Sequence, residues 1–432
     1  MELGQARRRS VGRGEQAHWD EKLRKHDPLD VILASTYGRL AHLVPIKMAR
    51  MAASPFGFYR GTVPLMAADL ALLPNTKIMA QLCGDAHVRN LGAFEAPDGR
   101  LIFDVNDFDE TIEGPWEWDV KRLAASLILA GRDAGNTDRA SRDAVLTFMR
   151  SYRECMLLLA EMRVVDAARY RVHGQFKGRG GMGILFKAQQ TTPLNVLKKL
   201  TVVRGRPRVF KENKPILTRV ADATARDVIR ALKSYRLTLP PERQHVLDFY
   251  KPEDVAFKVV GTGSVATRDY VVLCFGNGPT DPLWLQLKEE PVSSYAPYVK
   301  NAAIKMNQGQ RVVLGQRRMQ THSDILLGWT SMGGRDYLVR QLADHKATID
   351  ANDLKAKGLA RYAQTCGQVL AKGHARSGDA SMMAGYLGSG AKFDDAIERF
   401  AVCYADQTTK DHAKFVAAIK AGRIKAAKST YE

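Results

Sequence analysis

Cysteine is scarce and scattered in this sequence. The five cysteines are far apart, form no CxxC pair and match no zinc-ligand spacing: Cys83, Cys155, Cys274, Cys366 and Cys403. An odd number of widely spaced thiols is not typical of a disulfide framework and favours reduced cysteines in the cytoplasm. We therefore expect neither a structural zinc site nor disulfides.

Long apolar runs are also missing. No stretch of about 18 apolar residues occurs, so we expect no membrane-spanning helix. The opening residues, "MELGQARRRSVGRG", are charged and lead into no apolar segment, which argues against a secretory signal or anchor. Internal repeats and low-complexity tracts are absent as well.

Acidic residues are few relative to basic ones. The chain has 65 Lys and Arg against 46 Asp and Glu, a formal charge of +19. Such an excess indicates a polyanionic partner: nucleic acid, an acidic membrane surface or a phosphorylated small molecule. Against this background, residues 81–124 gather an unusual number of carboxylates and amides.

A chain of 432 residues exceeds the size of a single core, about 250–300 residues, so we expect at least two lobes. The patterns predict an α+β protein in four parts. These are a flexible basic arm (1–27), a helical lobe with catalytic and metal-binding loops (28–184), an antiparallel β-rich nucleotide-binding lobe (185–345), and C-terminal helices completing the helical lobe (346–432).

Several local expectations can be checked. We expect a helix over 27–52 with Asp27 as its cap, a turn and a short extended piece over 54–62, and a helix over 67–74. Strands are expected at 77–83 and 100–105, and Asp119 is expected to cap the helix that follows it.

The densest chemistry lies at Asp85 and Asn90, which form D-x-x-x-x-N after an apolar strand and Gly84. In phosphoryl transfer this spacing lets the Asp orient an attacking hydroxyl while the Asn binds a divalent ion. A second metal carboxylate should lie across the next hairpin, where Asp107 and Asp104 are the candidates. Hard oxygen ligands favour Mg²⁺.

The plainer explanation is that Asp, Asn and Gly gather here because turns use them, as at Asp98 and Gly99. The strand–loop–strand context and the second acidic segment favour a metal site instead. His87 is expected to order the loop by hydrogen bonding and not to bind metal.

A phosphate loop is predicted in "VVGTGSVATRDYVVLCF", where Gly261, Gly263 and Ser264 separate two strands. Glycine lets backbone N–H groups approach phosphate closely. One strand later, alternation in "LWLQLKEE" points Lys288 toward a ligand face. A hairpin turn and an exposed edge-strand lysine are the alternatives.

The acidic partner of Lys288 is an open question, because residues 291–323 contain no Asp or Glu. Active kinases pair this lysine with a Glu of the next helix. Gln310 or Gln316, or Glu289 or Glu290, are the alternatives in this sequence.

Seven segments together resemble the uncharacterised bacterial family called domain of unknown function 2252: "SPFGFYRGT", "CGDAHVRNLGAF", "FDVNDFDET", "WEWDVKRLAAS", "GTGSVATRDYVVL", "GQRRMQTHSDILLGW" and "GHARSGD". That family is thought to be related to protein kinases and aminoglycoside phosphotransferases. The resemblance implies a two-lobed kinase-like fold that binds Mg²⁺ and ATP.

The resemblance also implies roles for single residues. Asp85 resembles the catalytic-loop Asp, Asn90 its metal-binding partner, and Asp107 or Asp104 the second metal ligand. Asp119 resembles the Asp that braces the catalytic loop. Gly261, Gly263 and Lys288 resemble the phosphate-binding elements, but they follow the catalytic loop where kinases place them before it, so the order is circularly permuted.

We therefore predict Mg²⁺-dependent transfer of the ATP γ-phosphoryl group to a hydroxyl of an unknown acceptor, a small molecule or a protein. Nucleotidyl transfer on the same scaffold stays open. The alternatives are a catalytically inactive nucleotide-binding module, a two-metal hydrolase, and a nucleic-acid-binding protein. The last is not favoured, since "RGRP" (204–207) fits a hairpin turn. His374 and Arg376 are expected to pack near the cleft.

Overall fold

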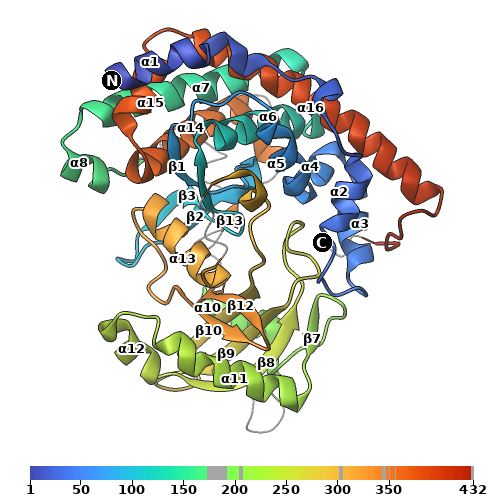
Figure 1. Ribbon diagram of the computed structural model, residues 1–432. Coiled ribbons are helices and arrows are strands. Elements are labelled where there is room, and N and C mark those ends of the chain that lie inside the picture. Colours follow the sequence, from blue (N-terminus) through green and yellow to red (C-terminus); the bar gives the residue numbers. More distant parts are fainter. Residues whose placement is uncertain are drawn as a thin grey trace.

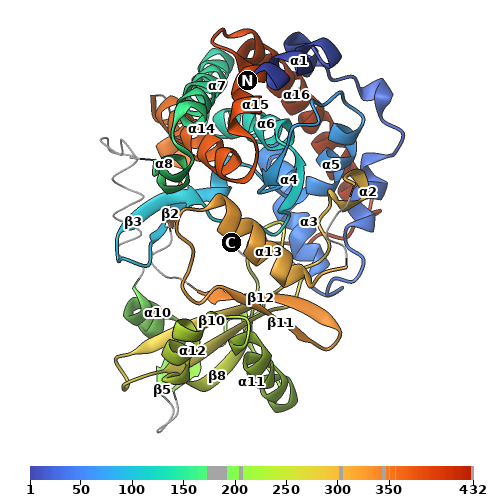
Figure 2. The same ribbon diagram turned by 60° about the vertical axis from the view of Figure 1, so that its left-hand side comes forward.

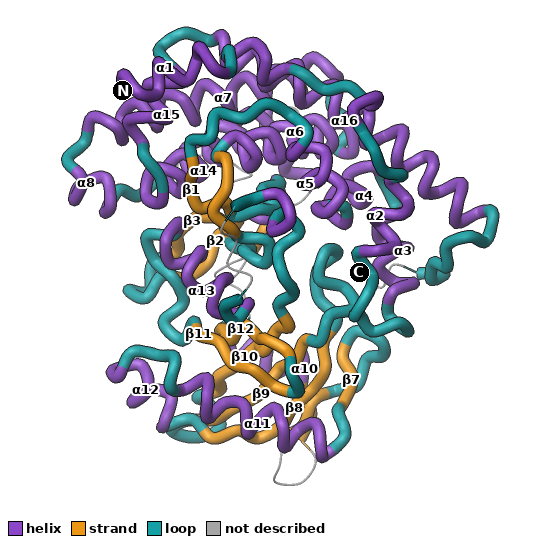
Figure 3. The backbone as a smooth tube through the Cα atoms, in the orientation of Figure 1, coloured by secondary structure: helices purple, strands orange, loops and turns teal. Residues whose placement is uncertain are grey.

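The computed structural model describes residues 1–172, 192–203, 208–300, 305–342, 347–349, 351–355 and 357–429. It is a mixed α+β protein, about 52% helical and 16% strand, with antiparallel sheets. Figure 1 and Figure 3 show the longer helices gathered at one end of the molecule and the largest sheet at the other. The α+β prediction is confirmed.

The helical part combines segments from residues 28–169 with segments from residues 357–420. Its helices are α2 (Pro28–Ala34), α3 (Val44–Ala52), α4 (Pro55–Gly61), α5 (Val63–Ala71), α6 (Glu117–Asp133), α7 (Asp138–Glu161), α8 (Val164–Arg169), α14 (Lys357–Ser377), α15 (Ala380–Leu387) and α16 (Lys392–Lys420). Helix α6 is buried on nearly all sides and packs against α7 and α16, while α7 packs along α14. The largest apolar core of the molecule lies among these helices.

The N-terminal segment differs from the flexible arm predicted for 1–27. It forms α1 (Glu2–Ser10) and two short 3-10 helices, η1 (Arg13–Ala17) and η2 (Glu21–Leu23), which lie along α15 and α16. Arg8 and Arg13 donate to the last carbonyls of α15, those of Tyr386 (3.0 Å) and Leu387 (2.7 Å). Cations are stabilised at a helix C-terminus, so the basic side chains dock the segment and do not leave it in solvent.

Three further local predictions fail. The helix expected over 27–52 is two helices, α2 and α3, separated by residues 35–43. Residues 54–62 form helix α4, because the Ser54 hydroxyl accepts from the Gly57 N–H (3.1 Å) and Pro55 occupies the first turn. Asp119 lies inside α6, which begins at Glu117, and does not cap it. Asp27 does cap α2, accepting from the Leu29 N–H at 2.7 Å.

Short sheets lie beneath the helices. Strand β1 (Met79–Leu82) pairs with β4 (Ile112–Pro115), and β2 (Leu91–Glu95) forms a hairpin with β3 (Leu101–Val105), joined on its other edge by β13 (Ala347–Thr348). The 3-10 turn η3 (Val88–Asn90) leads into β2. Gly99 adopts a positive φ of 78° in the predicted turn.

The β-rich part is a six-stranded antiparallel sheet in the order β11-β12-β10-β9-β8-β7. Its strands are β7 (Leu217–Arg219), β8 (Lys251–Lys258), β9 (Asp269–Phe275), β10 (Pro282–Glu289), β11 (Gly328–Met332) and β12 (Arg335–Gln341). All eight residues of β10 are buried, so Lys288 is not the edge-strand lysine of the alternative interpretation.

Helices within 185–345 are more numerous than the sequence patterns indicated. Helices α10 (Pro193–Leu200), α11 (Asp222–Arg236) and α12 (Pro241–Asp248) accompany the sheet, and α11 packs its apolar side on it. A small hairpin joins β5 (Thr201–Val203) to β6 (Arg208–Phe210), and its predicted turn at 204–207 lies outside the described residues. The remaining short turns are η4 (Ala296–Tyr298) and η5 (Ala351–Leu354).

Helix α13 (Gln308–Met319) connects the two parts of the molecule. It contacts β12 and β11 of the large sheet and also β1 and α14 of the helical part. Figure 2 shows α13 between the sheet and the helices. Within the described ranges, no helix combines the length and apolar character that a membrane span requires.

Candidate functional site

A cleft of about 710 Å³ opens between the helical part and the large sheet. Its walls combine segments that are far apart in sequence: the ends of α2 to α5, the loops after β1 and β3, the loop between β8 and β9, and the residues after β10. The cleft therefore brings the acidic segment and the glycine loop together. Among the predicted site residues, those that line it are Asp85, His87, Asn90, Asp107, Gly261, Gly263 and Ser264.

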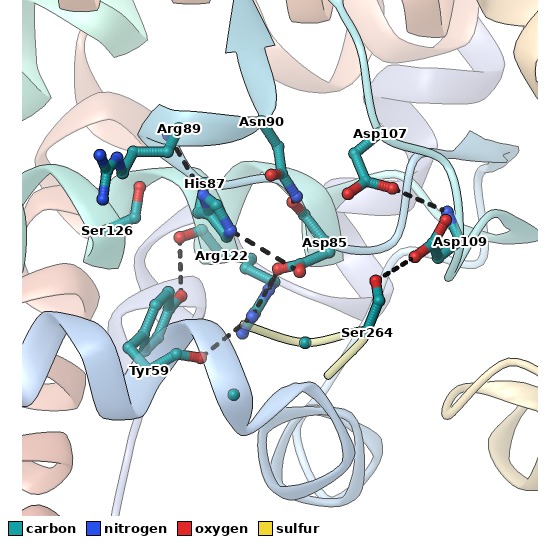
Figure 4. Close-up of polar contacts among 12 residues, drawn as sticks. Tyr59, Asp85, His87, Arg89, Asn90, Asp107, Asp109, Arg122, Ser126 and Ser264 are labelled. Carbon is teal, nitrogen blue, oxygen red and sulfur yellow. Dashed lines mark hydrogen bonds and ion pairs between the residues drawn. The ribbon is translucent and has the colours of Figure 1, made fainter. Parts of the chain in front are cut away.

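Asp85 follows β1 and is held by Arg122 of α6. Arg122 donates to Asp85 Oδ1 from Nε (2.7 Å) and from Nη2 (2.6 Å), and its guanidinium lies over the Tyr59 ring. Figure 4 shows this contact beneath Asn90 and beside Asp107. Both guanidinium nitrogens contact the same oxygen, so these charge-assisted contacts hold Asp85 Oδ1 in place.

The main chain just before Asp85 is held in place by hydrogen bonds to Asp119. Its carboxylate accepts from the N–H groups of Cys83 (2.8 Å) and Gly84 (3.0 Å). His374, fully buried, lies 3.3 Å from the Asp119 carboxylate and 2.8 Å from the Tyr152 hydroxyl. Gly84 has a positive φ of 82° and packs against Glu110, which explains why a glycine precedes Asp85.

Asn90 and His87 complete this loop. The Asn90 side-chain amide donates to the Asp85 carbonyl at 2.9 Å. His87 Nδ1 accepts from the Arg89 N–H at 3.1 Å, and burial lowers the pKa of His87 to about 3. The lowered pKa favours the neutral ring, whose Nε2 lies 3.7 Å from Asp85 Oδ2.

Lys288 finds its acidic partner in the acidic segment. Its ammonium forms an ion pair with Asp109 and lies 4.0 Å from Asp107 Oδ1, and Asp109 also accepts from the Ser264 hydroxyl at 2.9 Å. Of the four sequence candidates, Glu289 instead pairs with Arg268 and Arg335. No motif signalled Asp109 as the partner, because the contact joins segments 179 residues apart.

The two aspartates of this cluster are electrostatically different. Burial, together with the neighbouring Asp109, raises the pKa of Asp107 to about 6. For Asp109 the effect of burial is outweighed by Lys288, so its pKa lies below the ordinary value. Asp109 Oδ1 has no hydrogen-bond partner within the described structure.

Asp104 lies elsewhere. On β3, its buried carboxylate forms an ion pair with Lys372 of α14, and it does not line the cleft. Of the two candidates for the second metal carboxylate, only Asp107 therefore faces the cleft.

The glycine loop is held by the N-terminal helices. Gly261 has a positive φ of 61°, and its carbonyl accepts from Arg50. The carbonyl of Gly263 accepts from Arg39 (2.9 Å) and Lys47 (3.1 Å). Sequence reasoning missed these basic residues, because nothing local to α3 indicates a contact more than 200 residues away.

Glu290, one of the four candidates for the partner of Lys288, is a buried acid at the cleft. It lines the cleft next to β10, is 3% exposed, and neither of its carboxylate oxygens has a hydrogen-bond partner among the described residues. Burial raises its pKa well above the ordinary value, and the nearby Asp109 adds to this effect.

The donor set fits a divalent cation that shares its shell with a ligand. No three His, Cys, Asp or Glu side chains of the described chain form a ready metal cage. Mg²⁺ at nucleotide sites needs only one or two carboxylates, with phosphate oxygens and water completing the shell. Asp107, Asp109 with its unpartnered oxygen, and the Asn90 side chain could supply the protein ligands.

Comparison with known proteins yields no curated relative and no solved structure that matches. A model of one family, described as "uncharacterized protein conserved in bacteria", matches residues 39–418, which include most of the residues that line the cleft. The chain thus belongs to the bacterial family DUF2252, as its sequence segments predicted.

Proposed function

We propose that the protein is an Mg²⁺- and ATP-dependent phosphotransferase that moves the γ-phosphoryl group to a hydroxyl. The observation that carries the proposal is the meeting of two distant segments in one cleft. Lys288, after the glycine loop, pairs with Asp109 of the acidic segment, which follows the Asp85 loop. A metal–nucleotide complex is held by phosphate-binding groups and metal-binding carboxylates together, so these two segments must lie side by side.

We further propose that the fold is kinase-like and circularly permuted. Support comes from a β-rich part that carries the glycine loop and the lysine, set against a helical part that carries Asp85 and Asn90. In chain order the β-rich part interrupts the helical part. Permutation preserves a site because the site depends on spatial neighbours and not on chain order.

In this proposal the chain's own residues hold and orient the reactants. Asp85, whose Oδ1 is held by Arg122 and whose Oδ2 lies 3.7 Å from His87 Nε2, would orient the acceptor hydroxyl. Lys288 and the glycine-loop N–H groups bind phosphate oxygens. Asn90, Asp107 and Asp109 would hold Mg²⁺, which when bound neutralises charge on the phosphates.

The test is thermal unfolding with and without Mg-ATP. A ligand at about 100 times its Kd stabilises the folded state by roughly 2.7 kcal/mol, so the wild type should show a clear rise in Tm. Lys288→Met and Asp107→Asn should abolish the rise. Arg230→Ala, which removes an exposed cation of α11 far from the cleft, is the matched control and should keep it.

A wild type that shows no Mg-ATP shift at millimolar concentration would overturn the proposal. A shift without any ADP formation in the presence of candidate alcohols would favour the inactive nucleotide-binding module.

A further inference from the structure

Two cations from the N-terminal helices converge on one oxygen atom of the glycine loop. Arg39, between α2 and α3, donates from Nη1 to the Gly263 carbonyl at 2.9 Å, and Lys47 of α3 donates from Nζ to the same oxygen at 3.1 Å. Both side chains line the cleft. Two positive charges held this close repel each other unless an anion lies between or beside them.

Neither cation forms an ion pair within the described structure, although carboxylates act on both at longer range: Glu110 and Asp85 on Lys47, and Glu110, Asp109 and Glu289 on Arg39. Their hydrogen bonds in the described structure go to main-chain carbonyls: Lys47 to Gly61 and Gly263, and Arg39 to Ser35, Gly263 and Val265. Lys47 is only 2% exposed, and a buried charge without a partner is costly.

Holding the loop does not by itself explain these charges. Neutral donors would satisfy the carbonyl without the cost of removing two charges from water. The burial of Lys47 and the presence of Arg39 lower the pKa of Lys47 well below its usual value, and a bound anion would reverse this effect.

We propose that Arg39 and Lys47 form a phosphate-binding subsite between the glycine loop and Asp85. A planar guanidinium and a compact ammonium are suited to the oxygens of a phosphate group. The inference rests on the proposed function only for the origin of that group, which is either the terminal phosphate of the nucleotide or a phosphate carried by the acceptor. Inorganic phosphate is the probe common to both.

Arg50 provides a matched control. It also donates to a carbonyl of the same loop, that of Gly261, but it does not line the cleft. If the basic residues serve only to hold the loop, Lys47→Met and Arg50→Met should weaken phosphate binding alike. If Lys47 contacts the anion, only Lys47→Met should do so.

The experiment is calorimetric titration of the full chain with sodium phosphate, with sodium chloride at matched ionic strength as the blank. We expect the wild type to bind phosphate, Lys47→Met to bind at least about tenfold more weakly, and Arg50→Met to stay within about twofold of the wild type. Arg39→Gln, at a less buried position, repeats the test should Lys47→Met not fold. No phosphate-specific binding by the wild type, or equal losses in the Lys47 and Arg50 variants, would overturn the subsite.

Two further titrations show whether the phosphate group in the subsite belongs to the nucleotide or to the acceptor. If the terminal nucleotide phosphate occupies the subsite, Lys47→Met weakens Mg-ATP binding but not AMP binding, and phosphate competes with ATP. If a phosphate group of the acceptor occupies the subsite, the wild type saturated with Mg-ATP still binds inorganic phosphate. A wild type that binds phosphate but not Mg-ATP would keep the subsite and remove the nucleotide proposal. Mg-ATP binding without phosphate binding, unchanged in Lys47→Met, would remove the subsite alone.

Discussion

Lys288 shows how a buried charge is accommodated by groups that are distant in sequence. It is 2% exposed and is stabilised by Asp109 and, at longer range, by Asp107. The strand alternation predicted where the lysine points, but the partner comes from a loop that precedes it by 179 residues. Because this ion pair forms only in the folded protein, the loss of stability caused by replacing Asp109 should depend on whether Lys288 is present.

Asp109→Asn should destabilise the protein. Removing one member of a buried ion pair costs up to about 3–5 kcal/mol, and we expect about 2–3 kcal/mol here because Asp107 remains near the lysine. Urea unfolding midpoints measure the loss. The double variant Lys288→Met/Asp109→Asn should lose less than the single variant, since it leaves no unpaired cation; additive losses would contradict a direct pair.

Asp269 predicts a pH dependence of stability. It lies opposite Lys288 on β9, is 1% exposed, and burial raises its pKa to about 7 from 3.8. Between these values the folded protein binds the proton that the unfolded chain releases. Stability should therefore fall as pH rises from about 4 to about 7, by up to about 4 kcal/mol, and level off above.

Asp269→Asn should remove this contribution. The difference in unfolding free energy between variant and wild type should grow in favour of the variant from pH 4.5 to pH 7.5. Other titrating groups cancel in the difference, so two parallel curves would show that Asp269 is ionised in the folded protein throughout.

The sequence predicted candidate residues better than it could choose between them. Asp85, Asn90 and Asp107 were selected by spacing, and all three line one cleft. The sequence could not show which of Asp104 and Asp107 faces the cleft, because Asp104 is bound by Lys372, which lies 268 residues later in the chain. Arg39 and Lys47 were not identified from the sequence, because their contacts with Gly263 join segments 224 and 216 residues apart.

At the scale of elements, the contact between α7 and α14 depends on a glycine. A Cβ at Gly367 would meet the Phe148 carbonyl oxygen and lie 2.8 Å from the Tyr152 nitrogen, both main-chain atoms of α7. The two helices can therefore approach closely only where the side chain is absent.

Gly367→Ala should lower stability although alanine favours helix. The gain in helix propensity is about 1 kcal/mol, whereas forcing apart two packed helices costs about 1–3 kcal/mol and leaves gaps along the contact. Thermal unfolding should show a lower Tm. Gly390→Ala is the control: nothing lies within 4 Å of its Cβ position, so its Tm should remain close to that of the wild type.

Element type was more predictable than element boundaries. The alternating strands β8, β9, β10 and β12 and the long helices α7 and α16 follow patterns that are visible in sequence. The segment 54–62 was misjudged because its glycines and proline look like a turn, while Ser54 and Pro55 begin a helix. The basic N-terminus was misjudged because the carbonyls that bind it belong to α15.

At the scale of the whole molecule, the charge of +19 accompanies a cleft whose lining combines carboxylates, such as Asp85 and Asp107, with cations, such as Arg39 and Lys47. We expect a DNA duplex to bind weakly, with a steep salt dependence and without displacing Mg-ATP, since non-specific binding rests on released counterions. Competition titrations at 50 and 200 mM salt measure this, and displacement of Mg-ATP by the duplex at the higher salt would favour the nucleic-acid alternative.

The order of synthesis follows from the contact between α7 and α14. Helix α7 ends at Glu161 and α14 begins at Lys357, so at about 5–20 residues per second α7 emerges from the ribosome roughly 10–40 s before its partner. During that interval the apolar faces of α6 and α7 lack the cover that α14 and α16 later supply. The nascent chain is consequently a candidate client for chaperones that shield exposed helices, whereas the sheet can close before translation ends.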